Sequence, residues 1–253
     1  MSTSPRYTRA LIELLDRLAE TQNAVLDEVA NRCADTVERG GLVHLFGSGH
    51  SVIPTIEAFP RYGSFVGFFP LYDPRLMWSN VVGPGGAREL LWLERKEGYA
   101  EVFLQSYPFE QGDVMIVFSH GGLNAAPIEA AAYAKKKGLT VITVSSLDNA
   151  RVAQSTHSTC KKLPDHADIA IDNCVPPEDA LVDIGRPENV GAGSTMAVIF
   201  IAMSLVAETG ARLVEKGVMP TTFVSPNVPG IEKDHNQKVF QMFTRALFSR
   251  ACE

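Results

Sequence analysis

Apolar residues recur at every third or fourth position through the first forty residues of the chain. This spacing predicts one long amphipathic helix or a pair of helices. Gly40 and Gly41 follow, and glycine accepts the left-handed conformation that ends many helices. We therefore expect residues 1–40 to form a helical extension of the main domain. The recurring positions are Leu11, Leu14, Leu15, Leu18, Val25, Val29, Cys33 and Val37.

Beyond residue 40, short apolar runs of strand length alternate with longer segments of helical pattern. Parallel strands that are covered on both faces have such runs, without strict polar alternation. The order predicts an α/β fold, a doubly wound three-layer sandwich with a mainly parallel sheet. We expect a single domain over residues 1–253, with the α/β core at 41–216 and an extended segment and helix at 217–253. The strand runs lie at 42–46, 65–69, 113–119, 140–145 and 168–172, and the helical segments at 51–59, 87–107, 125–137, 190–216 and 231–250.

Composition and charge narrow the class of protein. The 253 residues include 23 basic and 29 acidic side chains, a net charge of −6, whereas a general nucleic-acid binder is usually basic. The four cysteines form no Cys-x-x-Cys pair, which predicts reduced thiols and no zinc site of that type. The longest apolar stretch, residues 196–207, is too short to span a bilayer, and the N-terminus lacks the apolar core of a signal peptide. We expect a cytoplasmic protein with no nucleic-acid or membrane partner.

Three segments rich in glycine and small polar residues lie at the junctions between predicted strands and helices. Ligands of a doubly wound sheet bind at the carboxyl ends of its strands, and a helix that starts there directs backbone N–H groups toward an anion. The lysine of a nucleotide P-loop and the third glycine of a dinucleotide fingerprint are both missing from the first segment. The candidate phosphate-binding residues are Gly47, Ser48, Gly49, His50 and Ser51 in the first segment, Ser119, His120, Gly121 and Asn124 in the second, and Ser194 and Thr195 in the third.

These segments resemble the SIS (sugar isomerase) domain family, close to its phosphoheptose-isomerase-like branch. The resemblance implies a five-stranded parallel sheet between helices and assembly as homodimers or homotetramers. It also implies binding of phosphosugars through the serine-rich loops, and many members of the family interconvert aldose and ketose phosphates. The matching segments are LVHLFGSGHS at 42–51, DVMIVFSHGGLN at 113–124, TVITVSS at 140–146 and NVGAGST at 189–195.

Departures from the family pattern bear on the ligand and on metal binding. The family's second loop usually reads Ser-x-Ser-Gly followed by Ser or Thr, whereas this chain has Gly121 at the second serine and Asn124 near the usual hydroxyl. Fewer hydroxyls would surround the anion. The sequence therefore leaves open whether the anionic group of the ligand is a phosphate, a sulfonate or a carboxylate. The His and Glu that can hold zinc in phosphoheptose isomerases correspond to Glu57 and Arg61, and the helix after Thr195 has no histidine. We therefore expect no metal and no other cofactor.

Aldose–ketose isomerisation moves a proton between C1 and C2 through an enediolate, which requires a base and donors for the developing oxyanion. Glu57 lies six residues after Ser51, and we predict that it is the base. His235 follows a proline-rich segment that could reach across a subunit boundary, and we predict that it opens the sugar ring. The family often takes a histidine from a neighbouring chain, which agrees with this role. His50 and His120 are rivals for it.

The sequence thus predicts a sugar-phosphate isomerase, with two alternatives from other classes. One is a phosphosugar lyase, because the Glu-Ala-Phe-Pro stretch at 57–60 loosely resembles the Glu-Cys-Pro-Pro stretch of the N-acetylmuramic acid 6-phosphate etherases. The other is a non-catalytic phosphosugar sensor. Arg75 is a further possible anion contact, and the acidic pair Glu178 and Asp179 could bind sugar hydroxyls or lie in a solvated loop.

Overall fold

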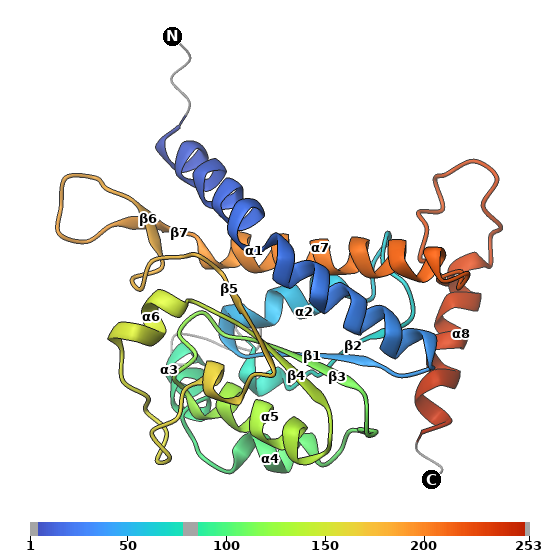
Figure 1. The fold of residues 1–253 in the computed structure, drawn as a ribbon, viewed down its shortest axis with the longest axis horizontal. Helices are drawn as coiled ribbons and strands as arrows, with labels where there is room; N and C mark the ends of the chain where they lie inside the picture. Colours follow the sequence, from blue (N-terminus) through green and yellow to red (C-terminus); the bar gives the residue numbers. More distant parts are fainter. Residues whose placement is uncertain (1–4, 78–85, 251–253) are drawn as a thin grey trace.

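A sheet of parallel strands lies at the centre of the fold (Figure 1). The computed structural model describes residues 5–77 and 86–250. The sheet has five strands in the order β2-β1-β3-β4-β5, and every neighbouring pair is parallel, which confirms the predicted architecture. The strands are β1 (Val43–Gly47), β2 (Phe68–Pro70), β3 (Val114–Phe118), β4 (Thr140–Ser145) and β5 (Ile169–Asp172).

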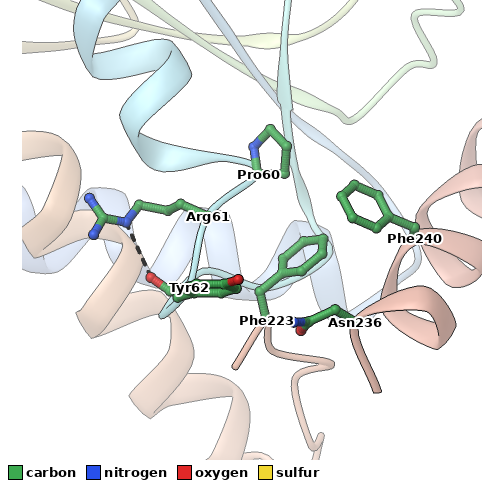
Figure 2. A pocket seen from close by; sticks show the side chains of 6 residues that line it. All are labelled: Pro60, Arg61, Tyr62, Phe223, Asn236 and Phe240. Atoms are coloured by element: carbon green, nitrogen blue, oxygen red, sulfur yellow. Dashed lines mark hydrogen bonds between the residues drawn. The ribbon is translucent and has the colours of Figure 1, made fainter. Parts of the chain in front are cut away.

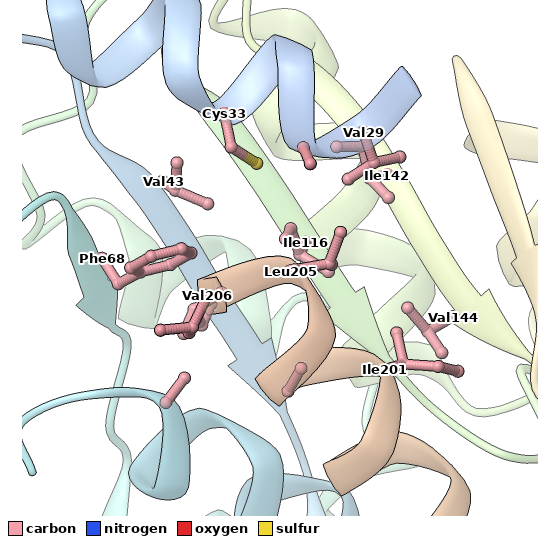
Figure 3. Packing of buried hydrophobic residues seen from close by; sticks show 14 of the residues in the cluster. Val29, Cys33, Val43, Phe68, Ile116, Ile142, Val144, Ile201, Leu205 and Val206 are labelled. Atoms are coloured by element: carbon pink, nitrogen blue, oxygen red, sulfur yellow. The ribbon is translucent and has the colours of Figure 1, made fainter. Parts of the chain in front are cut away.

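Helices cover both faces of this sheet, with α1, α2 and α7 on one face and α3, α4 and α5 on the other (Figure 1). Side chains alternate along a strand, so Val43 and Leu45 of β1 pack toward α1 and α7 while Phe46 packs toward α4 and α5. Figure 3 shows Cys33 of α1 and Leu205 of α7 lying over the strands, and both belong to one buried cluster. The doubly wound three-layer sandwich is confirmed. The helices are α1 (Arg6–Glu38), α2 (Ile53–Ala58), α3 (Gly86–Leu93), α4 (Tyr99–Leu104), α5 (Ala125–Lys136) and α7 (Ser194–Glu215).

Several elements differ from their predicted bounds. The helical pattern over 87–107 is two helices, since Gly98 takes a left-handed φ of 84° between α3 and α4. The second strand is shorter than predicted because Phe65 pairs with Thr222 instead of a sheet strand. Val190 begins no helix; it belongs to an antiparallel hairpin that the sequence pattern did not predict. That hairpin is β6 (Ala180–Val182) with β7 (Val190–Ala192), and α6 (Leu147–Val152) and α8 (His235–Phe248) complete the set of labelled elements.

Among the described residues, α7 is the one helix that is long and apolar enough to cross a membrane by length and composition. It packs along α1 and over the strands through residues such as Ile201 and Leu205 (Figure 3). One side of α7 is therefore packed into the domain, and 44% of its most apolar segment is buried within the described chain.

A buried polar cluster fastens the C-terminal helix to the amino ends of β1 and β3. Asp113 accepts hydrogen bonds from the Leu42 amide at 2.9 Å and from Arg250 Nη1 at 2.7 Å, and its Oδ2 lies 2.8 Å from His44 Nε2. Burial acts to raise the pKa of Asp113, but the hydrogen bonds from His44, Arg250 and Leu42 outweigh it and hold the pKa at about 2. The cluster lies at the opposite end of the strands from the predicted ligand loops.

Candidate functional site

Two of the predicted ligand segments lie side by side at the carboxyl ends of β1 and β3. We call residues 47–51 the first loop and residues 119–124 the second loop. Gly47 and Phe118 are register partners across the two strands, so the loops leave the sheet as neighbours. This is the edge where parallel α/β sheets bind ligands. The structure therefore brings together the two segments that sequence reasoning singled out first.

The first loop turns tightly and needs glycine at its start. A Cβ on Gly47 would lie 2.0 Å from the carbonyl oxygen of Ser51, so no side chain fits there. Gly49 has a left-handed φ of 60°, and residues 49–52 then form a single 3-10 turn before α2. His50 is exposed, and partial burial lowers its pKa while the charge of Asp179 acts to raise it. The first loop thus lies within electrostatic reach of the segment before β6.

The second loop is held by groups from the neighbouring strand ends. The Ser119 hydroxyl oxygen accepts a hydrogen bond from the Gly122 amide at 3.2 Å, and the Gly121 carbonyl accepts one from the Asn149 amide side chain at 2.9 Å. His120 Nδ1 lies 3.2 Å from the Asn173 side chain, which follows β5. These contacts fix the loop before any ligand binds, as preorganised sites require.

The third predicted segment already holds an anion that the chain itself supplies. Asp179, in a left-handed conformation with φ of 55°, accepts hydrogen bonds from the backbone amides of Gly193 and Ser194 at 3.1 and 2.7 Å and from the Ser194 hydroxyl at 2.7 Å. We predicted that Ser194 binds substrate, whereas the structure commits its donors to Asp179. Thr195, the next residue of α7, is half-buried. Asp179 therefore caps α7, whereas the sequence left open only whether it binds sugar hydroxyls or lies in a solvated loop.

Glu94 lies between the first two loops, and sequence reasoning missed it. Its Oε2 accepts a hydrogen bond from the Ser48 hydroxyl at 3.0 Å, and its Oε1 accepts one from the Asn124 side-chain amide at 2.9 Å. Burial raises the pKa of Glu94, against the hydrogen bond from Ser48 and the charge of Arg95. No local pattern marks this residue, because it follows α3 and meets the loops only in the folded chain.

The two predicted acid–base residues lie elsewhere in the chain. Glu57, near the end of α2, forms an ion pair with Arg61 one turn later, and its side chain is 38% exposed. His235 begins α8, and its Nε2 lies 2.8 Å from the Thr222 carbonyl oxygen. Within one chain the structure thus places His235 against the C-terminal segment instead of beside the loops. Their catalytic roles stay predictions.

A surface hollow of about 420 Å³ is lined on one side by residues that follow Glu57 in the chain and on the other by residues close to His235. Figure 2 shows Tyr62, Phe223 and Phe240 arranged around it, with Arg61 donating to the Tyr62 carbonyl at 3.2 Å. Its remaining lining residues are Pro60 and Asn236, and the Asn236 side chain is already bonded to the Val224 backbone. The hollow is therefore mainly aromatic and offers little to a charged sugar.

Arg75 and the positions that correspond to zinc ligands in phosphoheptose isomerases are paired with other side chains. Among residues 5–77 and 86–250 no group of three or more His, Cys, Asp or Glu side chains could hold a metal ion. The positions that correspond to the family's zinc ligands, Glu57 and Arg61, pair with each other instead. Arg75, a possible anion contact, forks onto the buried Asp73, with Nε–Oδ1 at 2.9 Å and Nη2–Oδ2 at 3.2 Å.

Comparison with known proteins agrees with this architecture. A model of the SIS domain matches residues 6–146. A UPF0309 protein of Listeria innocua is 33% identical over 95% of this chain and 96% of its own, and one from Halalkalibacterium halodurans is 33% identical over 95% and 94%. Among solved structures, phosphoheptose isomerases of Francisella tularensis and Neisseria gonorrhoeae superpose with TM-scores of 0.52 and 0.53 at 14% and 15% identity, each over 81% of this chain and 95% of its own. At that identity, the two structures show the fold alone.

Proposed function

Because the chain belongs to the SIS-domain family, we propose that it binds a phosphosugar between the first and second loops and interconverts its aldose and ketose forms. The observation that carries this proposal is the placement of two glycine–serine loops at adjacent strand ends, with a buried carboxylate between them. The loops provide hydroxyl, amide and imidazole groups at Ser51, Asn124 and His120. The Ser194 donors of the third segment are committed to Asp179, so the anion is expected on the first two loops.

The reaction needs one group that removes the C2 proton of the aldose and returns a proton to C1. Sequence reasoning assigns that base to Glu57 and ring opening to His235. Because His235 of the same chain lies against Thr222, its proposed role requires the histidine of a second copy. In this proposal, the role of His235 in ring opening therefore depends on the assembly of at least two copies of the chain.

The activity is tested by proton NMR of a panel of aldose and ketose phosphates mixed with the purified protein. We expect one member of the panel to convert into its isomer. The reason is that the two loops lie side by side and the carboxylate of Glu94 lies between them. A panel that stays unchanged would contradict the isomerase proposal. Release of lactate from an N-acetylmuramic acid 6-phosphate ether would instead identify the lyase, and binding without any conversion would identify the sensor.

We propose that the protein is a homodimer or homotetramer assembled through α7 and the neighbouring C-terminal segment. Only 44% of the most apolar part of α7 is buried within one chain. A hollow of about 400 Å³ beside Met203 and Ala207 shares Tyr62 with the aromatic hollow, and Tyr62 and Phe240 are 54% and 48% exposed. Exposed apolar side chains that gather on one face mark a protein–protein interface more often than an isolated one does.

The assembly is tested by size-exclusion chromatography with light scattering, which measures the mass of the assembly in solution. One chain has a mass of 27.5 kDa. We expect twice or four times that mass for the natural chain and a smaller assembly for Phe240→Lys, because a buried ammonium disfavours the interface. Val102→Lys is the matched control, since Val102 is exposed on α4 across the sheet. A monomeric natural chain would contradict the proposal.

A further inference from the structure

We infer that Glu94 is the group that carries the proton between C2 and C1, in place of Glu57. This inference rests on the proposed isomerase function and adds a residue to it. The first line of support is position, because Glu94 is bonded to one residue of each loop at the site. Ser48 belongs to the first loop and Asn124 to the second, and their hydrogen bonds to Glu94 are 3.0 and 2.9 Å long, within the normal range.

The fold holds the Glu94 carboxylate in place from the backbone side as well. The Glu94 amide donates to the Leu90 carbonyl at 2.9 Å, and its own carbonyl accepts from the Ala126 amide at 2.9 Å, at the start of α5. Leu90 also packs toward the first loop, since a Cβ on Gly49 would lie 3.9 Å from its Cδ2. The carboxylate is thereby fixed relative to both loops, and a fixed base loses little entropy when the substrate arrives.

Burial raises the proton affinity of the Glu94 carboxylate. Glu94 and Ser48 each keep 8% of their surface exposed, so the carboxylate is withdrawn from bulk water but is not sealed off. Desolvation raises its pKa toward the range in which general bases are most effective. The Ser48 hydroxyl and the Asn124 amide leave lone pairs on both carboxylate oxygens free to accept a proton.

Glu57 has the opposite surroundings. Its carboxylate is 38% exposed and pairs with the guanidinium of Arg61. In the proposed reaction, the C2–H bond breaks, the proton joins a Glu94 oxygen and the electron pair forms the enediolate. The protonated Glu94 then delivers a proton to C1 while a proton moves from O2 to O1, so the atoms and charges balance without any co-reactant.

The inference is tested by running the reaction in D₂O with the sugar phosphate that the natural protein converts. A base that shares its proton with solvent incorporates deuterium at C1 or C2, which NMR reads directly. We expect Glu94→Gln to slow both exchange and conversion by about 10²- to 10⁴-fold while the dissociation constant changes by no more than about threefold. Glu89→Gln, which changes an exposed glutamate on α3 five residues before Glu94, is the matched control and should match the natural protein.

A second variant keeps the test valid if Glu94→Gln does not fold. Glu94→Asp keeps the charge but withdraws it by one methylene, and we expect slower exchange at an unchanged melting temperature. In the natural protein, the rate should fall at acid pH with an apparent pKa above that of an ordinary glutamate. This acid dependence should disappear in Glu94→Gln.

The possible results separate the inference from the proposed function. If the natural protein neither binds nor converts any sugar phosphate, the proposed function fails. If it converts one and Glu94→Gln is equally fast, or if Glu57→Gln alone is slow, the role of Glu94 is overturned while the function stands. Equal loss of binding and exchange in Glu94→Gln would also overturn it, since Glu94 would then only join the loops.

Discussion

Replacing Gly47 by alanine is expected to weaken phosphosugar binding by about 100-fold while the sheet stays folded. A Cβ at this position would lie 2.0 Å from the Ser51 carbonyl oxygen and 2.5 Å from the Ser51 carbonyl carbon. Both are backbone atoms, so relief requires the whole turn that carries Ser48 and Ser51 to move. A displacement of about 1 Å in a binding group is enough to cost two orders of magnitude. Isothermal titration with the substrate, together with a circular dichroism melt, measures both quantities.

Gly121→Ala is the steric comparison for this experiment. Gly121 lies in the second loop, but a Cβ there would meet only the Asn149 side-chain nitrogen, at an ordinary 3.7 Å. We expect its effect on binding to be clearly smaller than that of Gly47→Ala. Equal effects of the two substitutions, or normal binding by Gly47→Ala, would mean that the first loop does not hold the ligand.

Replacing Asp113 by alanine is expected to lower the free energy of unfolding by about 3–5 kcal/mol, the cost of breaking a buried ion pair by removing one partner. Arg250 and His44 would lose the acceptor that they share at this buried position. Because α8 is fastened there, we expect its C-terminal end to detach first. Urea unfolding measures the free energy, and hydrogen exchange locates the detached segment.

An exposed ion pair provides the control for Asp113→Ala. Asp148 pairs with Arg151 on the surface of α6, with side chains 60% and 72% exposed, so Asp148→Ala should change stability by less than about 1 kcal/mol.

The dependence of stability on acid pH tests the Asp113 cluster in a second way. Since the folded pKa of Asp113 is about 2 and an unfolded aspartate titrates near 3.9, its stabilising contribution is complete above about pH 4 and is lost as the pH falls toward 2. Asp113→Ala should remove that part of the acid dependence; if it leaves the dependence unchanged, the cluster is not its source.

The layers of the fold could be predicted because buried strands and helices carry recognisable patterns of apolar residues along the sequence. The apolar runs of β1, β3 and β4 are covered on both faces, and the spacing of apolar residues in α1 follows the stripe that packs on the sheet. The β6–β7 hairpin has no such pattern, since β7 is exposed along its length and is held by backbone pairing. The second strand was misplaced because its first predicted residue, Phe65, finds a partner at Thr222, 157 positions away in the chain.

The candidate site follows the same logic. Gly47 and Ser119 lie at strand ends that a pattern of elements can predict, so both loops were found. Glu94 meets Ser48 and Asn124 only through the packing of α3 on α5 and on the first loop, which no spacing in the sequence encodes. The role of Asp179 was equally hidden, because a carboxylate fifteen residues before a helix gives no sign that it will cap that helix.

The most direct test of the account is a thermal-shift screen of the natural protein against sugar phosphates, sugar sulfonates and free sugars. A ligand at about one hundred times its dissociation constant stabilises the folded state by about 2.7 kcal/mol, which such a screen resolves easily. We expect a shift with one class of sugar phosphate, and none with the corresponding free sugar, because the first two loops are built to hold an anion. A shift with uncharged sugars alone, or with no compound of the three classes, would contradict a phosphosugar site at these loops.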